Sequence, residues 1–202
     1  MDVAERLKEL YDAERTRLLS LVGTEPPGAF DTPVFGEGNP APTLLLIGEA
    51  PGAEETKQGR PFVGKAGAQL TALLTLMCRV REEIYITNAV KYRPVAAGTR
   101  GFRNRTPVPG EVAAGLNLLR EEILLLRPRV VATLGNVPLA AAVGLFGLPR
   151  CTVGEVHGRT VPIAHGDYKA WLYPMYHPAS TIYNRALVPV LEADAIRLGE
   201  ML

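Results

Sequence analysis

A short apolar run, Leu44 to Ile47, leads directly into a glycine-rich stretch, and this junction constrains the fold more than any other feature. The stretch has two parts, residues 48–52 (GEAPG) and residues 59–67 (GRPFVGKAG), and a helical pattern begins near Ala66. A buried strand, a glycine-rich loop and a helix in that order typically form a ligand site at the carboxyl end of a parallel strand. Glycines let the backbone approach a ligand closely, and a helix start offers N–H groups to anions. The spacing matches neither GxGxxG nor GxxxxGK[ST], so neither standard nucleotide loop is predicted.

Apolar periodicity in the rest of the chain predicts strands that alternate with helices. Such alternation favours a parallel sheet with helices on both faces. The motif residues follow directly after strands, so they should meet at the sheet edge where ligands bind. The predicted strands are 43–47, 83–87, 129–134 and 171–175, and the predicted helices are 3–21, 66–79, 111–126, 137–146 and 184–202. In addition, residues 151–163 alternate as a hairpin would, and residues 92–109 are expected to form a long loop.

The composition is that of a globular chain. With 202 residues, 47% of them hydrophobic, the chain is long enough to bury a full core. We expect one domain over residues 1–202: a helix and loop (1–33), a motif-bearing core (34–185) and a closing helix (186–202). No apolar run is long enough for a bilayer, and the charged residues 1–17 do not resemble a signal peptide. The two cysteines, Cys78 and Cys151, lie far apart, which fits a reducing cytoplasm.

The motifs carry a family resemblance. The two parts of the glycine-rich stretch resemble, nearly letter for letter, the GE[AG]PG and G-x-PFVG-x-AG boxes of the uracil-DNA glycosylase superfamily, most closely its iron–sulfur branch, family four. The resemblance spans Val34 to Arg185 and implies an α/β fold, a three-layer α/β/α sandwich with a central four-stranded, mainly parallel sheet. Three further motifs occur in the family's order: GEGN at residues 36–39, ITN at residues 86–88 with Lys91 after it, and YHP at residues 176–178.

The resemblance implies a pocket for an extruded base. Phe62 would stack on uracil and replace the stacking that the base loses when it leaves the duplex. The side-chain oxygen of Asn88 would accept from uracil N3–H and its NH₂ would donate to O4, a pattern that cytosine reverses. Gly48 completes the substrate-binding set. By residue type alone, Phe62 is equally a core side chain and Asn88 an ordinary turn residue.

The same resemblance implies the catalytic residues. His177 would donate to uracil O2 and stabilise the charge that develops as the N-glycosidic bond lengthens. Ala50 stands where the best-known branch has a water-positioning aspartate, so the backbone of Glu49 and Ala50 would cradle the base and the water. Glu55 would lie near uracil C5, where it would exclude the methyl group of thymine or place the water. The ordinary alternatives are a surface histidine and an exposed loop glutamate.

Two segments are candidates for binding DNA. The predicted loop after the second strand is basic and contains Tyr92 and Phe102, so beside a base pocket it would clamp phosphates, although a basic loop is often only a solvated surface. The segment after His177 resembles the loop that relatives push into the duplex, with Ile182 or Tyr183 as the wedge. Tyr183 replaces an arginine that is common there. The candidate DNA-binding residues are Lys91, Arg93, Arg100, Arg103, Arg105, Ser180, Ile182, Tyr183 and Arg185.

The chain departs from family four at the cluster ligands. Family members hold a [4Fe–4S] cluster on four cysteines, two before the GEGN box and two at positions that correspond here to Tyr92 and Gly115. Neither of these two is a cysteine, the segment before the GEGN box has none, and Cys78 and Cys151 lie elsewhere. We therefore predict no cluster, no metal site and no other cofactor. A lengthened loop over residues 98–104, helped by Tyr92, would order the region instead. That loop also lacks the histidine that a covalent-trapping relative uses.

The resemblance implies a monofunctional, hydrolytic uracil-DNA glycosylase of base excision repair. It would be a monomer in the cytoplasm, at the bacterial nucleoid, and would act on single- or double-stranded DNA, leaving an abasic site. One alternative is a DNA-binding protein with little or no activity, against which the retained Phe62, Asn88 and His177 argue. A second acts on another deaminated base such as hypoxanthine or xanthine. A third, a small-molecule nucleotide binder, rests on the glycine-rich loop alone.

Overall fold

The computed structural model describes residues 2–24, 26–99 and 101–202, and within them it has a mixed sheet in the order β2-β4-β3-β7-β9-β8. The four inner strands run parallel, and β2 and β8 pair antiparallel at the two edges. The strands are β2 (Glu37–Gly38), β3 (Leu44–Gly48), β4 (Tyr85–Asn88), β7 (Val130–Leu134), β8 (Val161–His165) and β9 (Tyr168–Met175). The predicted parallel core is confirmed, and an edge strand extends it on each side.

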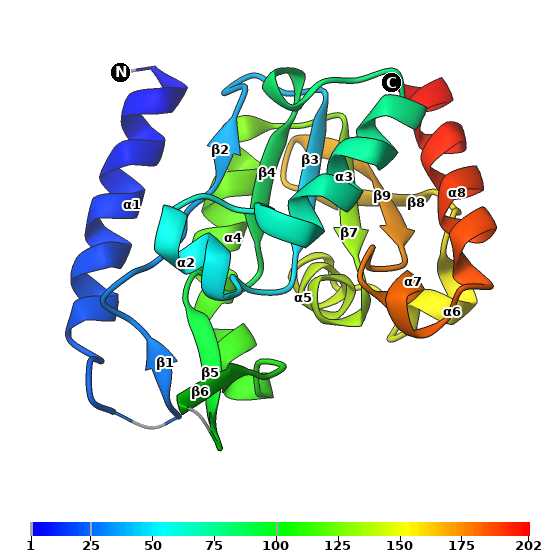
Figure 1. The fold of residues 1–202 in the computed structure, drawn as a ribbon. Helices are drawn as coiled ribbons and strands as arrows, with labels where there is room; N and C mark the ends of the chain where they lie inside the picture. Colours follow the sequence, from blue (N-terminus) through cyan, green and yellow to red (C-terminus); the bar gives the residue numbers. More distant parts are fainter. Residues whose placement is uncertain (1, 25, 100) are drawn as a thin grey trace.

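Helices cover both faces of the sheet (Figure 1). Helices α1, α4 and α5 pack against one face and α3 and α8 against the other. The helices are α1 (Val3–Leu19), α2 (Ala53–Gln58), α3 (Gly64–Leu76), the 3₁₀ turn η1 (Arg81–Glu83), α4 (Pro109–Leu126), α5 (Asn136–Phe146), α6 (Val153–Val156), α7 (Ser180–Tyr183) and α8 (Leu187–Met201). Among the described residues, none of these helices is both long and apolar enough to cross a membrane.

The central strands are buried on both faces, which explains their continuous apolar sequences. In β3, Leu45 faces the side of α4 and α5, while its neighbour Leu44 faces α3 and α8. Val131 and Val130 of β7 alternate in the same way. Parallel strands covered by helices on both faces are typically apolar throughout. The predicted α/β class with three layers is therefore confirmed.

The segment predicted as a long loop over residues 92–109 forms a β-hairpin instead. Strands β5 (Arg93–Gly98) and β6 (Gly101–Asn104) pair antiparallel, and the short strand β1 (Gly28–Ala29) joins β5 on its other side. The prediction was wrong because Pro94 and the Ala96-Ala97 pair are weak strand formers, so β5 is revealed as a strand only by its pairing with β6 and with distant β1.

The hairpin predicted within residues 151–163 is also corrected. The first part of this segment forms helix α6, and only the last residues enter strand β8. Strand β8 pairs with β9, with Val161 opposite Leu172, so the hairpin comprises β8 and β9. The helix is capped by Thr152, whose backbone N–H and hydroxyl both donate to the Glu155 carboxylate, an arrangement that the alternation of apolar residues does not reveal.

The carboxyl ends of the parallel strands define the functional edge of the molecule. In Figure 1 these strands run downward in the view, and α2, the β5–β6 hairpin and α7 are found on the side toward which they run. These three elements follow β3, β4 and β9 respectively in the sequence. The sheet thus brings the segments that carry the motifs together at one edge.

Candidate functional site

A cavity of about 190 Å³ lies at this edge of the sheet. Pockets for drug-sized ligands usually measure about 300–1,000 Å³, so this cavity suits a single small ring such as one nucleobase. The residues that line it come from the β3–α3 segment, β4, β6 and the segment after β9: Ala50, Gly52, Glu55, Phe62, Ala66, Asn88, Asn104 and His177. The structure therefore brings the predicted residues Ala50, Glu55, Phe62, Asn88 and His177 together around one cavity.

Asn88 lines the cavity, and Gly48 lies beside it without being part of the lining. They end the neighbouring strands β3 and β4 and lie opposite each other in the parallel register. Asn88 is only 3% exposed. A Cβ at Gly48 would lie 2.6 Å from the Phe62 ring and would also collide with Oδ1 of Asn88. Only glycine therefore fits between the two side chains that the sequence assigns to uracil.

Phe62 is held in a strained backbone conformation. Its φ of 52° lies in the left-handed region, which for a bulky residue costs about 1–3 kcal/mol. Arg81 holds this conformation, because its Nη1 donates to the Phe62 carbonyl at 2.9 Å and its Nη2 bonds the Pro61 carbonyl. Arg81 is in turn paired with Glu37 at 2.9 Å. The phenylalanine side chain is thus fixed over the cavity by an ion pair that sequence reasoning did not identify.

Glu55 ties the two parts of the glycine-rich stretch together. Its Oε2 accepts from Gly52 N–H and its Oε1 from Val63 N–H, both at 3.1 Å. The Glu55 carboxylate therefore fixes the loop that carries Phe62 while it also lines the cavity. The side chain of Glu49 is not part of the lining. Burial raises the pKa of Glu49, and a hydrogen bond with Thr106 partly offsets this.

His177 presents one ring nitrogen as a donor. Ala179 N–H donates to Nδ1 at 3.1 Å, so the neutral ring carries its proton on Nε2. Burial lowers the pKa of His177, which favours this neutral form. The His177 ring lies 6.2 Å from the Phe62 ring, centroid to centroid, with an angle of 25° between their planes. The imidazole and the phenyl ring therefore flank the same space, with an N–H donor on the imidazole.

Lys91 does not reach the surface, and its predicted role in binding DNA is corrected. The side chain of Lys91 is 1% exposed and pairs at 2.6 Å with Glu122, which is 0% exposed. Its ammonium group also donates to Thr87 Oγ1 at 2.6 Å and to the Asn88 carbonyl at 2.7 Å. Tyr11 donates to the other oxygen of Glu122 at 2.7 Å. Lys91 therefore supports the end of β4 from inside the protein.

Comparison with known proteins identifies the family. The sequence profile described as the Uracil DNA glycosylase superfamily matches residues 35–195. The chain belongs to the uracil-DNA glycosylase superfamily. A Type-4 uracil-DNA glycosylase of Archaeoglobus fulgidus is 34% identical over 168 residues, which cover 83% of this chain and 81% of that protein. A Type-4 uracil-DNA glycosylase of Thermotoga maritima is 39% identical over 76% of this chain and 73% of its own. A Type-5 enzyme of Thermus thermophilus is 33% identical over 72% and 68%.

In this superfamily member the basic residues of the β5–β6 hairpin have different surroundings. Arg103 is exposed on β6. Arg93 is half-buried and donates from Nε to Oδ1 of Asn104 at 2.6 Å. Arg105 is paired with Glu111 at 2.6 Å, so the structure gives it a role in anchoring the hairpin to α4 rather than the predicted phosphate contact. Arg100, also predicted to bind DNA, lies outside the described residues.

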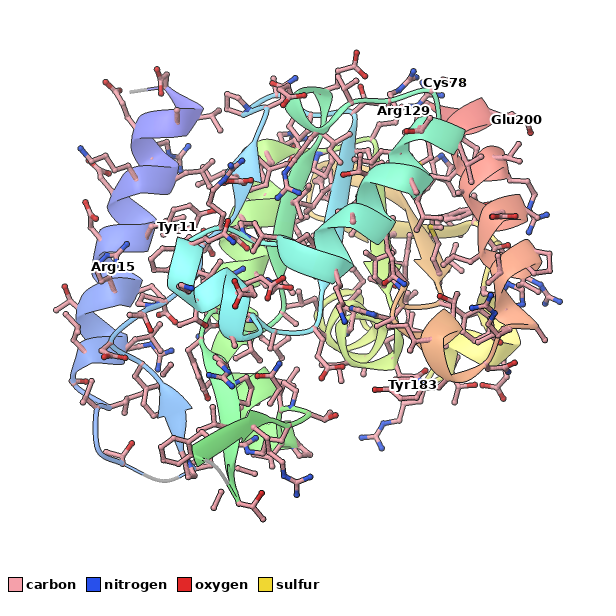
Figure 2. The ribbon with its side chains drawn as sticks, viewed as in Figure 1. Tyr11, Arg15, Cys78, Arg129, Tyr183 and Glu200 are labelled. Atoms are coloured by element: carbon pink, nitrogen blue, oxygen red, sulfur yellow. The ribbon has the colours of Figure 1, made fainter. Side chains whose placement is uncertain are left out.

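The segment that carries the predicted wedge projects from the molecule. Ile182 and Tyr183 of α7 are 57% and 91% exposed, and Arg185 after them is exposed as well. Figure 2 shows Tyr183 pointing away from the protein at the edge where the parallel strands end. Ser180 instead turns inward, because its hydroxyl donates to the His177 carbonyl at 2.6 Å. Ser180 therefore fixes the turn after His177.

The region that would hold the iron–sulfur cluster is filled by apolar side chains. Tyr92 packs against Phe30 with ring centroids 4.4 Å apart, and its hydroxyl donates to Glu111 at 3.0 Å. Leu18 and Val90 complete this buried group. A side chain at Gly115 would collide with the Ala89 carbonyl. The residues at these positions offer no thiolate and do not fit a cluster. Within the described part of the chain, no group of three or more metal-binding side chains is found.

Proposed function

We propose that this protein is a uracil-DNA glycosylase that takes uracil out of DNA and hydrolyses its N-glycosidic bond. The arrangement of Phe62, Asn88 and His177 around one base-sized cavity carries the proposal. The match to the superfamily and the identity to Type-4 uracil-DNA glycosylases support it. A strained Phe62 and a buried Asn88 beside the N–H donor of His177 are expected in an active glycosylase and have no evident use in an inactive one.

The base would be recognised on its face and on its edge. Phe62 stacks on the extruded ring, while Asn88 accepts from N3–H and donates to O4. Gly48 leaves room for both side chains. Nε2–H of His177 donates to O2. Because Nδ1 of His177 is occupied by Ala179 N–H, the donor does not depend on a protonated ring.

The chemistry is a hydrolysis in which the bond between C1′ and N1 breaks as water adds to C1′. The electron pair of that bond leaves with the uracil, and the donor at O2 stabilises this charge more strongly in the transition state than in the substrate. Glu55, a carboxylate at the cavity, accepts the proton that the water releases. The methyl side chain of Ala50 cannot accept a proton, so the Ala50 backbone only shapes the site.

The test is a glycosylase assay with the full chain on single-stranded and duplex oligonucleotides that contain one uracil. Alkali cleavage after incubation reports abasic sites. We expect the wild-type protein to release uracil from at least one of these DNAs. Tight binding of both DNAs with uracil left in place would contradict the proposal, and the same assay with hypoxanthine and xanthine in place of uracil would then identify the substrate.

The pH dependence follows from the half-buried His177. Because burial lowers the pKa of His177 below its ordinary value of 6.5, the ring is neutral at pH 7. We expect kcat/KM to stay level as the pH falls from about 8 to 6.5 and to decline only below that. The stabilisation that comes from neutral His177 is likewise present above about pH 6.5 and is lost as the pH falls through the folded pKa. A kcat/KM that rises toward acid would show that the imidazolium is required.

The matched control for this profile is His177→Gln. Glutamine keeps an N–H donor at the same place but does not titrate. Its profile should therefore lack the acid-side decline that His177 causes. If the wild-type and variant profiles fall together, another group controls the pH dependence.

We also propose that the protein works without an iron–sulfur cluster. The packing of Tyr92, Phe30 and Leu18 in that region supports this, because the side chains leave no thiolate to bind iron. Freshly purified, anaerobically prepared protein should show no visible absorption band and no stoichiometric iron. Iron together with a charge-transfer band would contradict it.

We propose that the working unit is a monomer with a single domain, since Phe62, Asn88 and His177 of one chain already surround the cavity and no second chain is needed to complete it. Its substrate would be uracil-containing DNA, so we expect the protein to act on DNA in the cytoplasm. Arg103, Ile182, Tyr183 and Arg185 are the exposed candidates for contacts with that DNA.

A further inference from the structure

Asn104 contributes an amide to the cavity that none of the roles above uses. It is the last residue of β6 and lines the cavity together with Gly52 and Glu55. Its Nδ2 lies 3.2 Å from the position that a Cβ at Gly52 would occupy, and Oε2 of Glu55 lies 2.7 Å from the same position. The hairpin therefore brings an amide nitrogen over the glycine-rich loop, beside the carboxylate that lines the cavity.

Arg93 fixes which end of this amide faces the cavity. Nε of Arg93 donates to Oδ1 of Asn104 at 2.6 Å. A flipped amide would place NH₂ against the guanidinium, which has donors only, so this flip is disfavoured. The NH₂ group is therefore directed away from Arg93. The hydrogen bonds of the described residues include no acceptor for it.

The amide is held on a well-anchored frame. Arg105, next in the sequence, pairs with Glu111 at 2.6 Å, and its backbone N–H donates to the Pro94 carbonyl at 3.2 Å. The Tyr92 hydroxyl donates to the same glutamate at 3.0 Å. The base of the hairpin is thus fixed to α4, and a polar group on such a frame is preorganised for a ligand.

The position of Asn104 indicates which part of a substrate it would meet. Both asparagines line the cavity, but Asn88 is buried whereas Asn104, on the hairpin, is exposed to solvent. A base bound by Phe62 and Asn88 leaves its sugar and phosphates at the mouth. The Glu55 carboxylate, which lines the same cavity, would repel a phosphate, so a neutral N–H donor near it would help to hold a sugar or phosphate oxygen there.

We propose that Asn104 donates from Nδ2 to a sugar–phosphate oxygen of the extruded nucleotide, and that Arg93 is the positioning residue that fixes the Asn104 amide. This inference rests on the proposed function, since the nucleotide is the one whose base the cavity takes. The sequence predicts that Arg93 contacts a phosphate itself. In this proposal Arg93 instead acts by orienting the Asn104 amide.

The first test compares Asn104→Ala with Asn104→Asp. Aspartate has the same shape and keeps an acceptor for Arg93, but it replaces the donor with a negative charge. We expect kcat/KM on uracil-containing single-stranded DNA to fall about 10- to 100-fold in Asn104→Ala, as for loss of a hydrogen bond to a charged oxygen. Asn104→Asp should fall further. If Asn104 only supports the hairpin, Asn104→Asp will match the wild type, which would overturn the proposal.

The second test asks whether Arg93 acts through Asn104. Arg93→Gln should lower kcat/KM, but it should add little in the Asn104→Ala background, because the amide that it orients is gone. Arg103→Gln is the matched control, since it removes the same charge from an exposed position on the same hairpin. Its effect should add fully to that of Asn104→Ala. Additive effects of Arg93→Gln would show that Arg93 contacts DNA by itself.

A third measurement separates sugar–phosphate contact from base contact. Inhibition by free uracil should be equal in the wild type and in Asn104→Ala, because free uracil has no sugar or phosphate. Weaker inhibition of the variant by free uracil would show that Asn104 contacts the base, which would overturn the assignment to a sugar–phosphate oxygen. If the wild type releases no uracil, the proposed function fails. The affinities of wild type, Asn104→Ala and Asn104→Asp for uracil-containing DNA then test Asn104 alone, and equal affinities would overturn it.

Discussion

Asn88→Ala is expected to lower the rate of uracil release by about a hundred- to a thousandfold while the protein stays folded. Asn88 is 3% exposed and lines the cavity, so in the complex no water would replace its bonds to N3–H and O4. In the variant, the N3–H and O4 groups of uracil lose their hydrogen-bond partner in a buried site. This loss weakens both binding and catalysis. Single-turnover release of uracil from an oligonucleotide measures this directly.

The fold should survive because the Asn88 side chain makes no hydrogen bond to the described protein. The backbone bonds of Asn88 are unaffected by the change, including that from Lys91 to its carbonyl at 2.7 Å. Asn39→Ala is the control, since Asn39 follows strand β2 and is not part of the cavity lining, so this variant should keep the wild-type rate. An Asn88→Ala protein that keeps the wild-type rate would show that the base is recognised elsewhere.

The central part of the fold was predictable because its information is local. Each parallel strand is a continuous apolar run, and the residues that follow the strands must meet at one edge. That reasoning, with the family resemblance, led to Phe62, Asn88 and His177, which do lie around one cavity. The roles given to these three residues stay predictions until the variants are measured.

The parts that could not be predicted depend on partners far away in the sequence. Lys91 looks like the first residue of a basic loop, yet it pairs with Glu122, 31 residues later. Arg81 is likewise paired with Glu37, which lies 44 residues earlier. Asn104 reaches the cavity only because β5 and β6 form a hairpin, and the sequence of residues 93–98 does not predict that hairpin. A basic side chain gives no local sign of whether an acid or a phosphate is its partner.

The buried pair of Lys91 and Glu122 gives the second large prediction, and it concerns stability. Both side chains are essentially inaccessible, at 1% and 0% exposure. Burial lowers the pKa of Lys91, and the adjacent Glu122 partly offsets this. Removing one partner of such a pair leaves the other as an uncompensated charge, which typically costs about 3–5 kcal/mol. Lys91→Met and Glu122→Gln should each lower the free energy of unfolding by about that amount.

The double variant should be more stable than the sum of the two single changes predicts, because the charges disappear together. Urea unfolding at pH 7 of the wild type, both single variants and the double variant measures this coupling. The control is the exposed pair of Arg127 and Asp167, whose side chains are 49% and 88% exposed, and Asp167→Asn should leave the unfolding midpoint unchanged. Additive losses in the Lys91–Glu122 cycle would show that the two groups act separately.

Because Lys91 also bonds the Asn88 carbonyl, the double variant should release uracil more slowly than the wild type even where it is fully folded. That result would show that the Lys91–Glu122 pair positions Asn88 for base recognition as well as stabilising the core.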